Sequence, residues 1–170
     1  MLRLERVTAE HRAAAIRLLQ AQFDEHQILL SPERLDAAVS GMIENRERGT
    51  MLLALEDAQP VGLAALSYTW TLERGGLVAW LDELYVLPRC RGRGLGTALL
   101  HAAQNVAKTA GCAALELEVD GTHRRAENLY KRAGFEPLPR SRWALRLEAS
   151  GASTSPGRSC SLLTGSGTNS

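Results

Sequence analysis

Cysteine is scarce in this sequence, and the few that occur do not form a framework. The three residues, Cys90, Cys112 and Cys160, are an odd number, and none belongs to a Cys-x-x-Cys pair. Such a set argues against a disulfide scaffold and against a cysteine zinc site. The four histidines also lack a metal-binding spacing such as His-x-x-x-His. We therefore expect no metal cofactor.

An excess of charge of one sign is missing as well. The 20 Lys and Arg residues are balanced by 19 Asp and Glu residues, which leaves a net charge of +1. General nucleic-acid binders normally carry a basic excess, so we expect no nucleic-acid partner.

Long apolar segments are also missing. No run approaches the ~18 apolar residues that a membrane-spanning helix needs. The longest runs, such as residues 51–55, have the length of a strand. Residues 1–12 mix charges of both signs and contain no apolar stretch typical of a signal peptide. The sequence therefore predicts no membrane partner and a cytoplasmic location.

What the chain does contain is the composition of an ordinary globular protein. Its 170 residues are 45% hydrophobic and 23% charged, which suits one domain. The composition changes after residue 148, because Ser, Gly and Thr make up 14 of the 22 residues from 149 to 170. Such a segment buries too little apolar area to offset its ordering entropy. We therefore predict a folded domain over residues 1–148 and a flexible tail over residues 149–170.

Hydrophobic periodicity and turn signals divide the predicted domain into strands and helices. The predicted strands cover residues 2–7, 51–56, 61–70, 77–87, 113–119, 135–138 and 143–147. The predicted helices cover residues 9–23, 31–46, 95–110 and 122–133. Consecutive strands in the middle exclude a pure strand–helix–strand repeat. This order predicts an α/β or α+β domain with a mixed, twisted sheet of six or seven strands and helices on both faces.

The most informative segment is the glycine-rich turn Arg91-Gly92-Arg93-Gly94-Leu95-Gly96-Thr97, between a strand and a helix. A helix N-terminus presents unpaired N–H groups and the positive end of its dipole. Glycines let a phosphate approach the backbone, and the two arginines add positive charge. The turn therefore predicts an anion site, although it lacks the lysine and the spacing of a Walker A loop.

Two other interpretations of the turn stay open at this point. The spacing Gly92-x-Gly94-x-Gly96 is one residue short of the dinucleotide-binding fingerprint. Glu116 or Glu118 lies where the acidic residue of that fingerprint would be expected, which would predict an oxidoreductase. The turn could also serve only to connect a strand to a helix.

Two segments of the chain resemble the GCN5-related N-acetyltransferase (GNAT) superfamily. The turn is similar to that family's pyrophosphate loop, with Arg91-x-x-Gly94-x-Gly96 after Val86-Leu87-Pro88. Residues 126–137 resemble its Ala-x-x-Leu-Tyr-x-x-x-Gly-Phe segment. The resemblance covers residues 1–148 and implies a GNAT-type fold with acetyl-CoA as co-substrate. It implies an N-acetyltransferase that moves an acetyl group to a primary amine directly, in a ternary complex.

By this resemblance, the loop binds the diphosphate of acetyl-CoA, and the preceding strand offers backbone groups to the pantetheine and the acetyl carbonyl. The implied cofactor-binding residues are Leu84, Tyr85, Val86, Arg91, Gly92, Arg93, Gly94, Leu95, Gly96, Thr97 and His123. The family often has Asn where His123 stands, so the sequence departs from the pattern there.

Acetyl transfer also needs a proton for the leaving thiolate and a way to deprotonate the amine. The resemblance implies Tyr130 as the general acid, because a phenol with a pKa near ~10 is protonated at neutral pH. The candidate bases are Asp82 and Glu118. Asp82 shares strand parity with Leu84, and Glu118 matches the base of ribosomal-protein N-terminal acetyltransferases. Parity places Glu83 on the opposite face. Deprotonation through ordered water, without one essential base, stays open.

The charges predict a small, cationic primary amine as the acceptor. Asp82, Glu116, Glu118 and Asp120 lie on the two strands that flank the predicted cleft, and carboxylates attract a cation. Residues 24–26 are expected at the rim of its far wall. A peptide N-terminus or a protein lysine stays open as the acceptor, as does a non-catalytic acyl-CoA-binding module. A homodimer also stays open.

Overall fold

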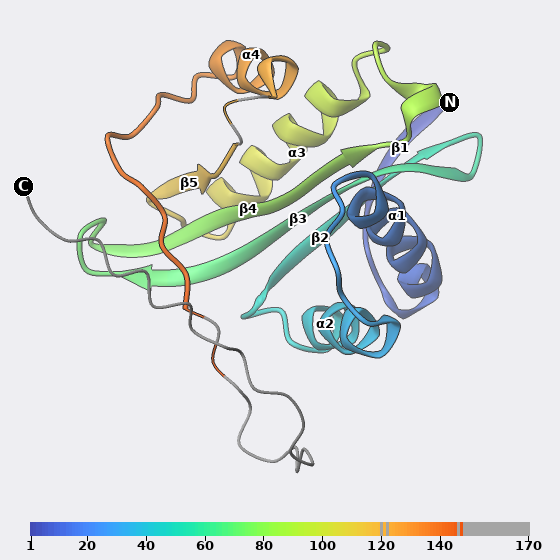
Figure 1. Cartoon of the computed structure of the whole chain (residues 1–170), viewed down its shortest axis with the longest axis horizontal. Helices are drawn as coiled ribbons and strands as arrows, with labels where there is room; N and C mark the ends of the chain where they lie inside the picture. The colour runs from blue at the N-terminus through green and yellow to red at the C-terminus, as the bar shows by residue number, and fades with distance from the viewer. Residues whose placement is uncertain (120, 122, 146, 148–170) are drawn as a thin grey trace, which may run out of the picture. The chain divides into compact units, whose positions relative to one another are not determined.

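The computed structural model describes residues 1–119, 121, 123–145 and 147 (Figure 1). Its strands are β1 (Leu2–Arg6), β2 (Gly49–Glu56), β3 (Gln59–Thr71), β4 (Gly76–Val86) and β5 (Ala114–Leu117). Its helices are α1 (Arg12–Glu25), α2 (Pro32–Glu44), α3 (Leu95–Thr109) and α4 (Arg124–Arg132), with short 3-10 helices at Ala9–His11 and Pro88–Cys90. The chain divides into two units, Met1–Glu136 and Pro137–Ser170, and all of these elements belong to the first.

The strands form one mixed sheet in the order β1-β2-β3-β4-β5. The pairs from β1 to β4 are antiparallel, and β4 and β5 are parallel. Asp57 and Ala58 join β2 to β3 with φ of +49° and +64°, as a tight hairpin turn requires. The chain reaches the parallel strand β5 by a crossover through α3. This topology confirms the predicted mixed sheet.

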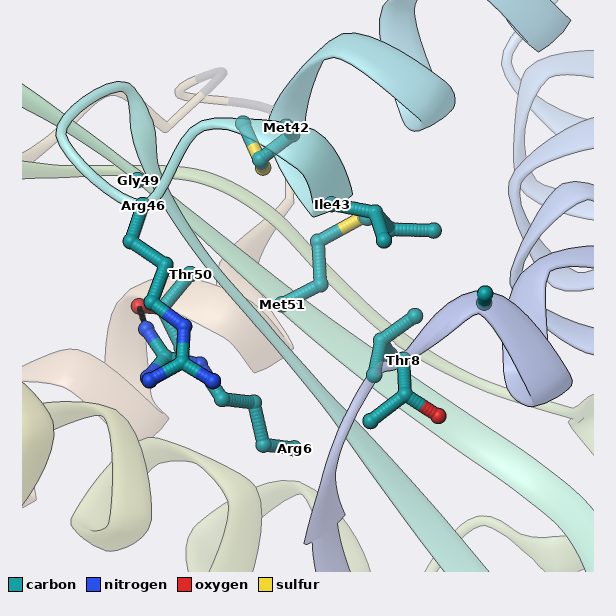
Figure 2. Close-up of a pocket in the computed structure, with 10 residues that line it drawn as sticks. Arg6, Thr8, Met42, Ile43, Arg46, Gly49, Thr50 and Met51 are labelled. Atoms are coloured by element: carbon teal, nitrogen blue, oxygen red, sulfur yellow. Dashed lines mark hydrogen bonds between the residues drawn. The ribbon is translucent and has the colours of Figure 1, made fainter.

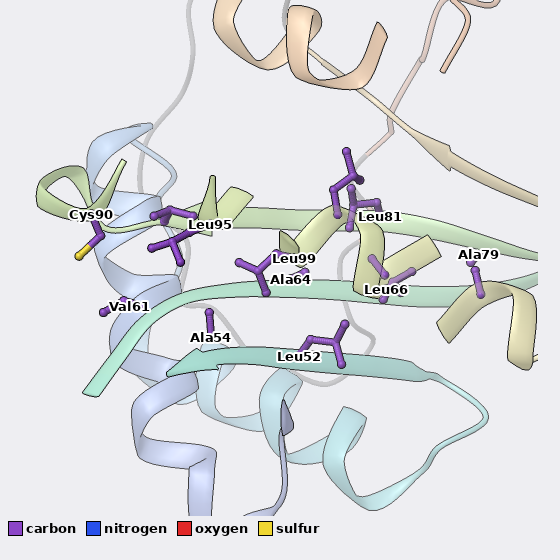
Figure 3. Close-up of a cluster of buried hydrophobic side chains, with 14 residues drawn as sticks. Leu52, Ala54, Val61, Ala64, Leu66, Ala79, Leu81, Cys90, Leu95 and Leu99 are labelled. Atoms are coloured by element: carbon purple, nitrogen blue, oxygen red, sulfur yellow. The ribbon is translucent and has the colours of Figure 1, made fainter. Parts of the chain in front are cut away.

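Helices cover both faces of the sheet, α1 and α2 on one face and α3 and α4 on the other (Figure 1). Side chains of a strand alternate between the faces, so each face has its own apolar cluster. In β2, Leu52 and Ala54 belong to the cluster under α3, whereas Leu53 and Leu55 belong to the cluster under α1 and α2. Figure 3 shows the α3 cluster, in which Leu99 is completely buried. The central strands are therefore buried on both sides.

Local sequence signals set the ends of the helices. The Ser31 side chain caps α2 by accepting a hydrogen bond from the Arg34 backbone N–H at 3.4 Å, and Pro32 begins the helix. Gly111 follows α3 with a φ of +77°, a conformation that favours glycine after a helix. Both boundaries agree with the sequence prediction.

The sheet has five strands in the described residues, so the prediction of six or seven strands is wrong. Residues 135–138 form no strand. Pro137 and Pro139 have no N–H to donate to a neighbouring strand. The Arg140 N–H instead donates to the Leu138 carbonyl oxygen at 2.9 Å.

Several other predictions fall partly or wholly outside the described residues. In the predicted strand 143–147, the described residues form no strand, and residue 146 is not among them. Asp120, Thr122 and the predicted tail over residues 149–170 also lie outside, so the domain boundary at residue 148 stays a prediction. Among the described residues, no helix is both long and apolar enough to cross a membrane. The cytoplasmic location and the homodimer stay predictions.

Candidate active site

Strands β4 and β5 separate halfway along β4. Their parallel pairing ends at Leu81 and Leu117, whereas β4 continues to Val86. Residues 82–86 therefore have no β5 partner in the described part of the chain. The two strands are therefore parallel neighbours that diverge at one end, which opens the edge of β4 around Leu84.

A β-bulge lies at the point of separation. Leu81 pairs with Leu66 of β3, but Glu83 pairs with Ala65, so the register skips Asp82. Ala65 belongs to the apolar cluster under α1 and α2. Because paired residues share a face, Glu83 points toward the α1 side of the sheet.

The glycine-rich turn leads into α3 as predicted. Gly92 and Gly94 have φ of +81° and +82°, a region that favours glycine. Gly94 is the N-cap of α3, and it has no side chain to accept hydrogen bonds from the first-turn N–H groups. A Cβ at Gly94 would meet no atom within 4 Å. This helix end can therefore bind an anion through its backbone.

The two arginines of the turn are ion-paired with carboxylates. Arg91 donates from Nη1 and Nη2 to the two carboxylate oxygens of Glu25 at 2.8 and 2.7 Å, which lowers the pKa of that carboxyl. Arg93 likewise binds both carboxylate oxygens of Glu56 at the end of β2. Most of the expected positive charge is thus compensated within the protein. An anion bound here would therefore be attracted chiefly by the backbone N–H groups of the turn.

Apart from His123, the other predicted cofactor-binding residues lie on the open stretch of β4 and in the first turn of α3. The open stretch of β4 contains Leu84, Tyr85 and Val86. The Val86 carbonyl oxygen accepts a hydrogen bond from Arg91 Nε at 2.8 Å. The Tyr85 side chain is buried and lies under Arg91, whose guanidinium carbon is 5.5 Å from the ring centroid. The backbone of Tyr85, and not its ring, is therefore at the strand edge.

Glu83 is a candidate functional residue that the sequence reasoning did not assign to the site. Burial raises the pKa of its carboxyl to about 7, and the negative charge of Asp82 adds to this rise. Gln22 of α1 opposes the rise, because its Nε2 donates to Glu83 Oε2 at 2.6 Å. A carboxyl that titrates near neutral pH is suited to take a proton from an ammonium group.

Tyr130 stands on α4, half-buried, on the α3 side of the sheet. Its ring meets the ring of Phe135 edge-on, with centroids 5.7 Å apart. Burial raises the pKa of its phenol, and the negative charge of Glu83 raises it further. The phenol is therefore protonated at neutral pH. The structure thus brings Tyr130 and Glu83 within electrostatic reach of each other.

The predicted acidic residues are only partly brought together. Asp82 is exposed at the bulge, and Glu118 is exposed just after the end of β5. Glu116 is ion-paired with Arg74, and its carboxylate accepts a hydrogen bond from Arg74 Nε at 2.8 Å. Asp120 lies outside the described residues.

His123 is exposed immediately before α4, and its ring meets the His26 ring edge-on, with centroids 5.2 Å apart. His26 directly follows α1. Together with the pair between Glu25 and Arg91, this contact places the predicted rim residues beside the turn and the start of α4. Asp24 instead accepts a hydrogen bond from Gln20 on the surface of α1.

A separate cavity of about 130 Å³ contains none of the predicted site residues. It lies between the end of β1, the end of α2 and the start of β2, so it is at the opposite end of the sheet from the turn. Figure 2 shows Arg6 and Arg46 beside Thr50, to which Arg6 donates a hydrogen bond. Within the described residues, no three metal-ligating side chains gather in one place.

Comparison with known proteins identifies relatives of the whole first unit. A model of the acetyltransferase (GNAT) family matches residues 8–135. An uncharacterized N-acetyltransferase, YhfO, of Bacillus subtilis (strain 168) is 31% identical, over 73% of this chain and 83% of that protein. Thialysine N-epsilon-acetyltransferase of Mus musculus is also 31% identical, over 71% of this chain and 75% of that protein.

Solved structures share the fold. Aminoglycoside N-acetyltransferase AAC(6')-Iy in complex with CoA has a TM-score of 0.75, covers 86% of this chain and 95% of its own, and is 17% identical. The family match sets aside the dinucleotide-binding interpretation of the glycine-rich turn.

Proposed function

We propose that this chain, which belongs to the acetyltransferase (GNAT) family, acetylates a small cationic primary amine by direct attack on acetyl-CoA in a ternary complex. Membership of the family makes the chain an acetyl-transferring enzyme with acetyl-CoA as co-substrate. The observation that carries the proposal is the stretch of β4 that β5 leaves open, with Glu83 facing α1 on one side and Tyr130 of α4 on the other. The Glu83 carboxylate suits deprotonation of the incoming amine, and the Tyr130 phenol suits protonation of the leaving thiolate.

Acetyl-CoA would bind with its diphosphate at the N-terminus of α3, where Gly94 leaves the first-turn N–H groups without a side-chain cap. The pantetheine and the acetyl carbonyl would then meet the backbone of residues 84–86, which β5 does not cover. Backbone N–H groups fixed in a strand are suitable donors for the negative charge that develops on the carbonyl oxygen.

Glu83 would act as the general base, directly or through one water. It takes a proton from the ammonium group, and the neutral nitrogen attacks the thioester carbon to form a C–N bond. When the C–S bond breaks, the Tyr130 hydroxyl donates its proton to the sulfur. The second proton of the nitrogen returns to the Tyr130 phenolate through water, and Glu83 releases its own proton to solvent.

Asp82 and Glu118 would attract a cationic acceptor without taking its proton. Both are exposed near the separation of β4 and β5, and exposed carboxylates raise the local concentration of a cation. Asp82 also keeps the pKa of Glu83 high. One relative is named for thialysine, which supports an amine acceptor.

The test is a thiol-release assay with acetyl-CoA and a panel of polyamines, aminoglycosides, amino acids and short peptides. We expect the highest kcat/KM for small cationic amines, with an acidic limb near pH 7 that Glu83→Gln removes. Glu127→Gln is the matched control, because that carboxylate pairs with Lys131 on the same helix. A neutral, acidic or peptidic preferred acceptor would reject the proposed substrate class and leave the enzyme class intact.

A further inference from the structure

Gln22 of α1 combines near-complete burial with an unused hydrogen-bond acceptor. The residue is 8% exposed, and its Nε2 donates a hydrogen bond to Glu83 Oε2 at 2.6 Å. Its Oε1 is also buried, and it has no hydrogen-bond partner within the part of the chain that the structure describes. Buried polar atoms are nearly always paired, because an unpaired one has lost its hydrogen bonds to water. An unpaired acceptor beside the proposed base can accept a hydrogen bond from a group of the bound substrate.

We propose that Gln22 positions the acceptor amine, with its Oε1 accepting one N–H while the Glu83 carboxylate takes another proton. This inference rests on the proposed function. An ammonium group has three N–H bonds, so Glu83 can remove one proton while Gln22 retains a second hydrogen. The retained hydrogen bond fixes the orientation of the nitrogen, and orientation of a nucleophile contributes strongly to rate.

The same contact makes Gln22 a specificity-determining residue. An alcohol or a thiol has a single hydrogen on its nucleophilic atom. If that hydrogen is given to Glu83, the Gln22 Oε1 is again left unpaired. Sites with buried polar groups discriminate strongly against ligands that fail to pair them. Gln22 therefore favours acetylation of nitrogen over oxygen or sulfur.

The test compares Gln22→Met with Gln20→Met. Methionine has a similar length and no acceptor oxygen, whereas Gln20 lies on the same helix and binds Asp24 on the surface at 2.8 Å. For Gln22→Met we expect about a tenfold or larger rise in the KM of the amine, the size of one lost hydrogen bond. The Kd of acetyl-CoA and the Ki of the hydroxyl analogue of the acceptor should not change. Gln20→Met should behave as wild type.

The pH profile separates this role from a merely structural one. The hydrogen bond from Gln22 lowers the pKa of Glu83, so the acidic limb of kcat/KM should move to higher pH in Gln22→Met. The other titratable neighbours of Glu83, Asp82 and Tyr130, are unchanged in this variant. Gln22→Glu keeps an acceptor oxygen and adds a negative charge beside Glu83. It should therefore still bind the amine and move the acidic limb of kcat/KM to a still higher pH.

Two outcomes of these experiments distinguish a failure of this inference from a failure of the proposed function. Normal wild-type turnover with an unchanged KM and an unchanged pH limb in both Gln22 variants would overturn this inference alone. Absence of wild-type turnover with any amine would overturn the proposed function and this inference with it. If Gln22→Met does not fold, Gln22→Leu, which also lacks an acceptor oxygen, takes its place: a raised amine KM supports this inference, and an unchanged KM overturns it.

Discussion

The Glu83 carboxylate raises the pKa of the Tyr130 phenol, although the two side chains come from opposite faces of the sheet. Glu83 is in register with a residue of the α1 cluster, whereas Tyr130 packs against the α3 cluster. The pairing of β5 with β4 ends at Leu117 and Leu81, so the edge of β4 beside Glu83 is open. A thioester at this edge would therefore have a base on one side and an acid on the other.

Gly94→Asp should weaken the binding of acetyl-CoA at least tenfold. The φ of +82° places strain of roughly 1–2 kcal/mol on any side chain at this position, and the new carboxylate would repel the diphosphate. Isothermal titration with acetyl-CoA measures the effect. Gly111→Asp is the control, because Gly111 has a similar φ of +77° at the other end of α3. Equal losses of affinity in both variants would show that strain, and not the charge at the phosphate site, is responsible.

Tyr130→Phe should lower kcat by about 10–100-fold with little change in the affinity for acetyl-CoA, since only the proton donor is removed. Single-turnover measurements of thiol release isolate the chemical step. Tyr68→Phe is a matched control, because that hydroxyl hydrogen-bonds to Thr50 at 3.2 Å and lies outside the candidate site. An unchanged chemical rate in Tyr130→Phe would make Tyr130 a packing residue.

Local signals in the sequence predicted most of the framework of the site. The Gly94 turn and the apolar stripe of α3 follow from residue types within a few positions of one another. The role of Glu83 could not be predicted in this way. Parity along β4 gives the correct face for Glu83, but the bulge at Asp82 and the contact with Gln22 arise from pairing with β3 and packing of α1.

Contacts between residues that are distant in the sequence explain the other differences between the sequence prediction and the structure. The charges of Arg91 and Arg93 were expected to face a phosphate, but carboxylates distant in the sequence, Glu25 and Glu56, engage them. Apolar alternation also predicted a strand over residues 143–147. Alternation describes which face a strand would bury, but a strand forms only with a partner that the sequence does not identify.

Asp82→Asn and Glu118→Gln should each raise the KM of a cationic acceptor a few-fold, with a smaller effect at high salt, because exposed charges are screened. Asp82→Asn should also move the acidic limb of kcat/KM to lower pH, since Asp82 raises the pKa of Glu83. Steady-state kinetics at two salt concentrations measures both effects. Glu116→Gln is the control, because it removes a carboxylate that pairs with Arg74 on the part of β5 that β4 covers. If all three variants retain the wild-type KM, the acidic cleft is not a determinant of the acceptor.

Glu83→Gln should stabilise the fold at pH 8 more than at pH 4.5. Burial raises the folded-state pKa of Glu83 to about 7 from its ordinary 4.5, so the folded protein holds this proton more tightly than the unfolded chain. The associated stability is fully present below pH 4.5 and is lost as the pH rises through 7. Glutamine does not ionise, so the variant escapes this loss. We expect its Tm to exceed that of wild type by roughly 5 °C at pH 8.

Circular-dichroism melts at both pH values measure this difference without any substrate, so the result is independent of the proposed reaction. Glu127→Gln is the control with the opposite sign, because the hydrogen bond from Lys131 lowers the pKa of Glu127. The stability from Glu127 is present above its unfolded pKa and is lost as the pH falls, so removing this carboxylate should never raise Tm at pH 8. An equal Tm difference between Glu83→Gln and wild type at both pH values would mean that Glu83 titrates as an ordinary carboxyl and is not the base.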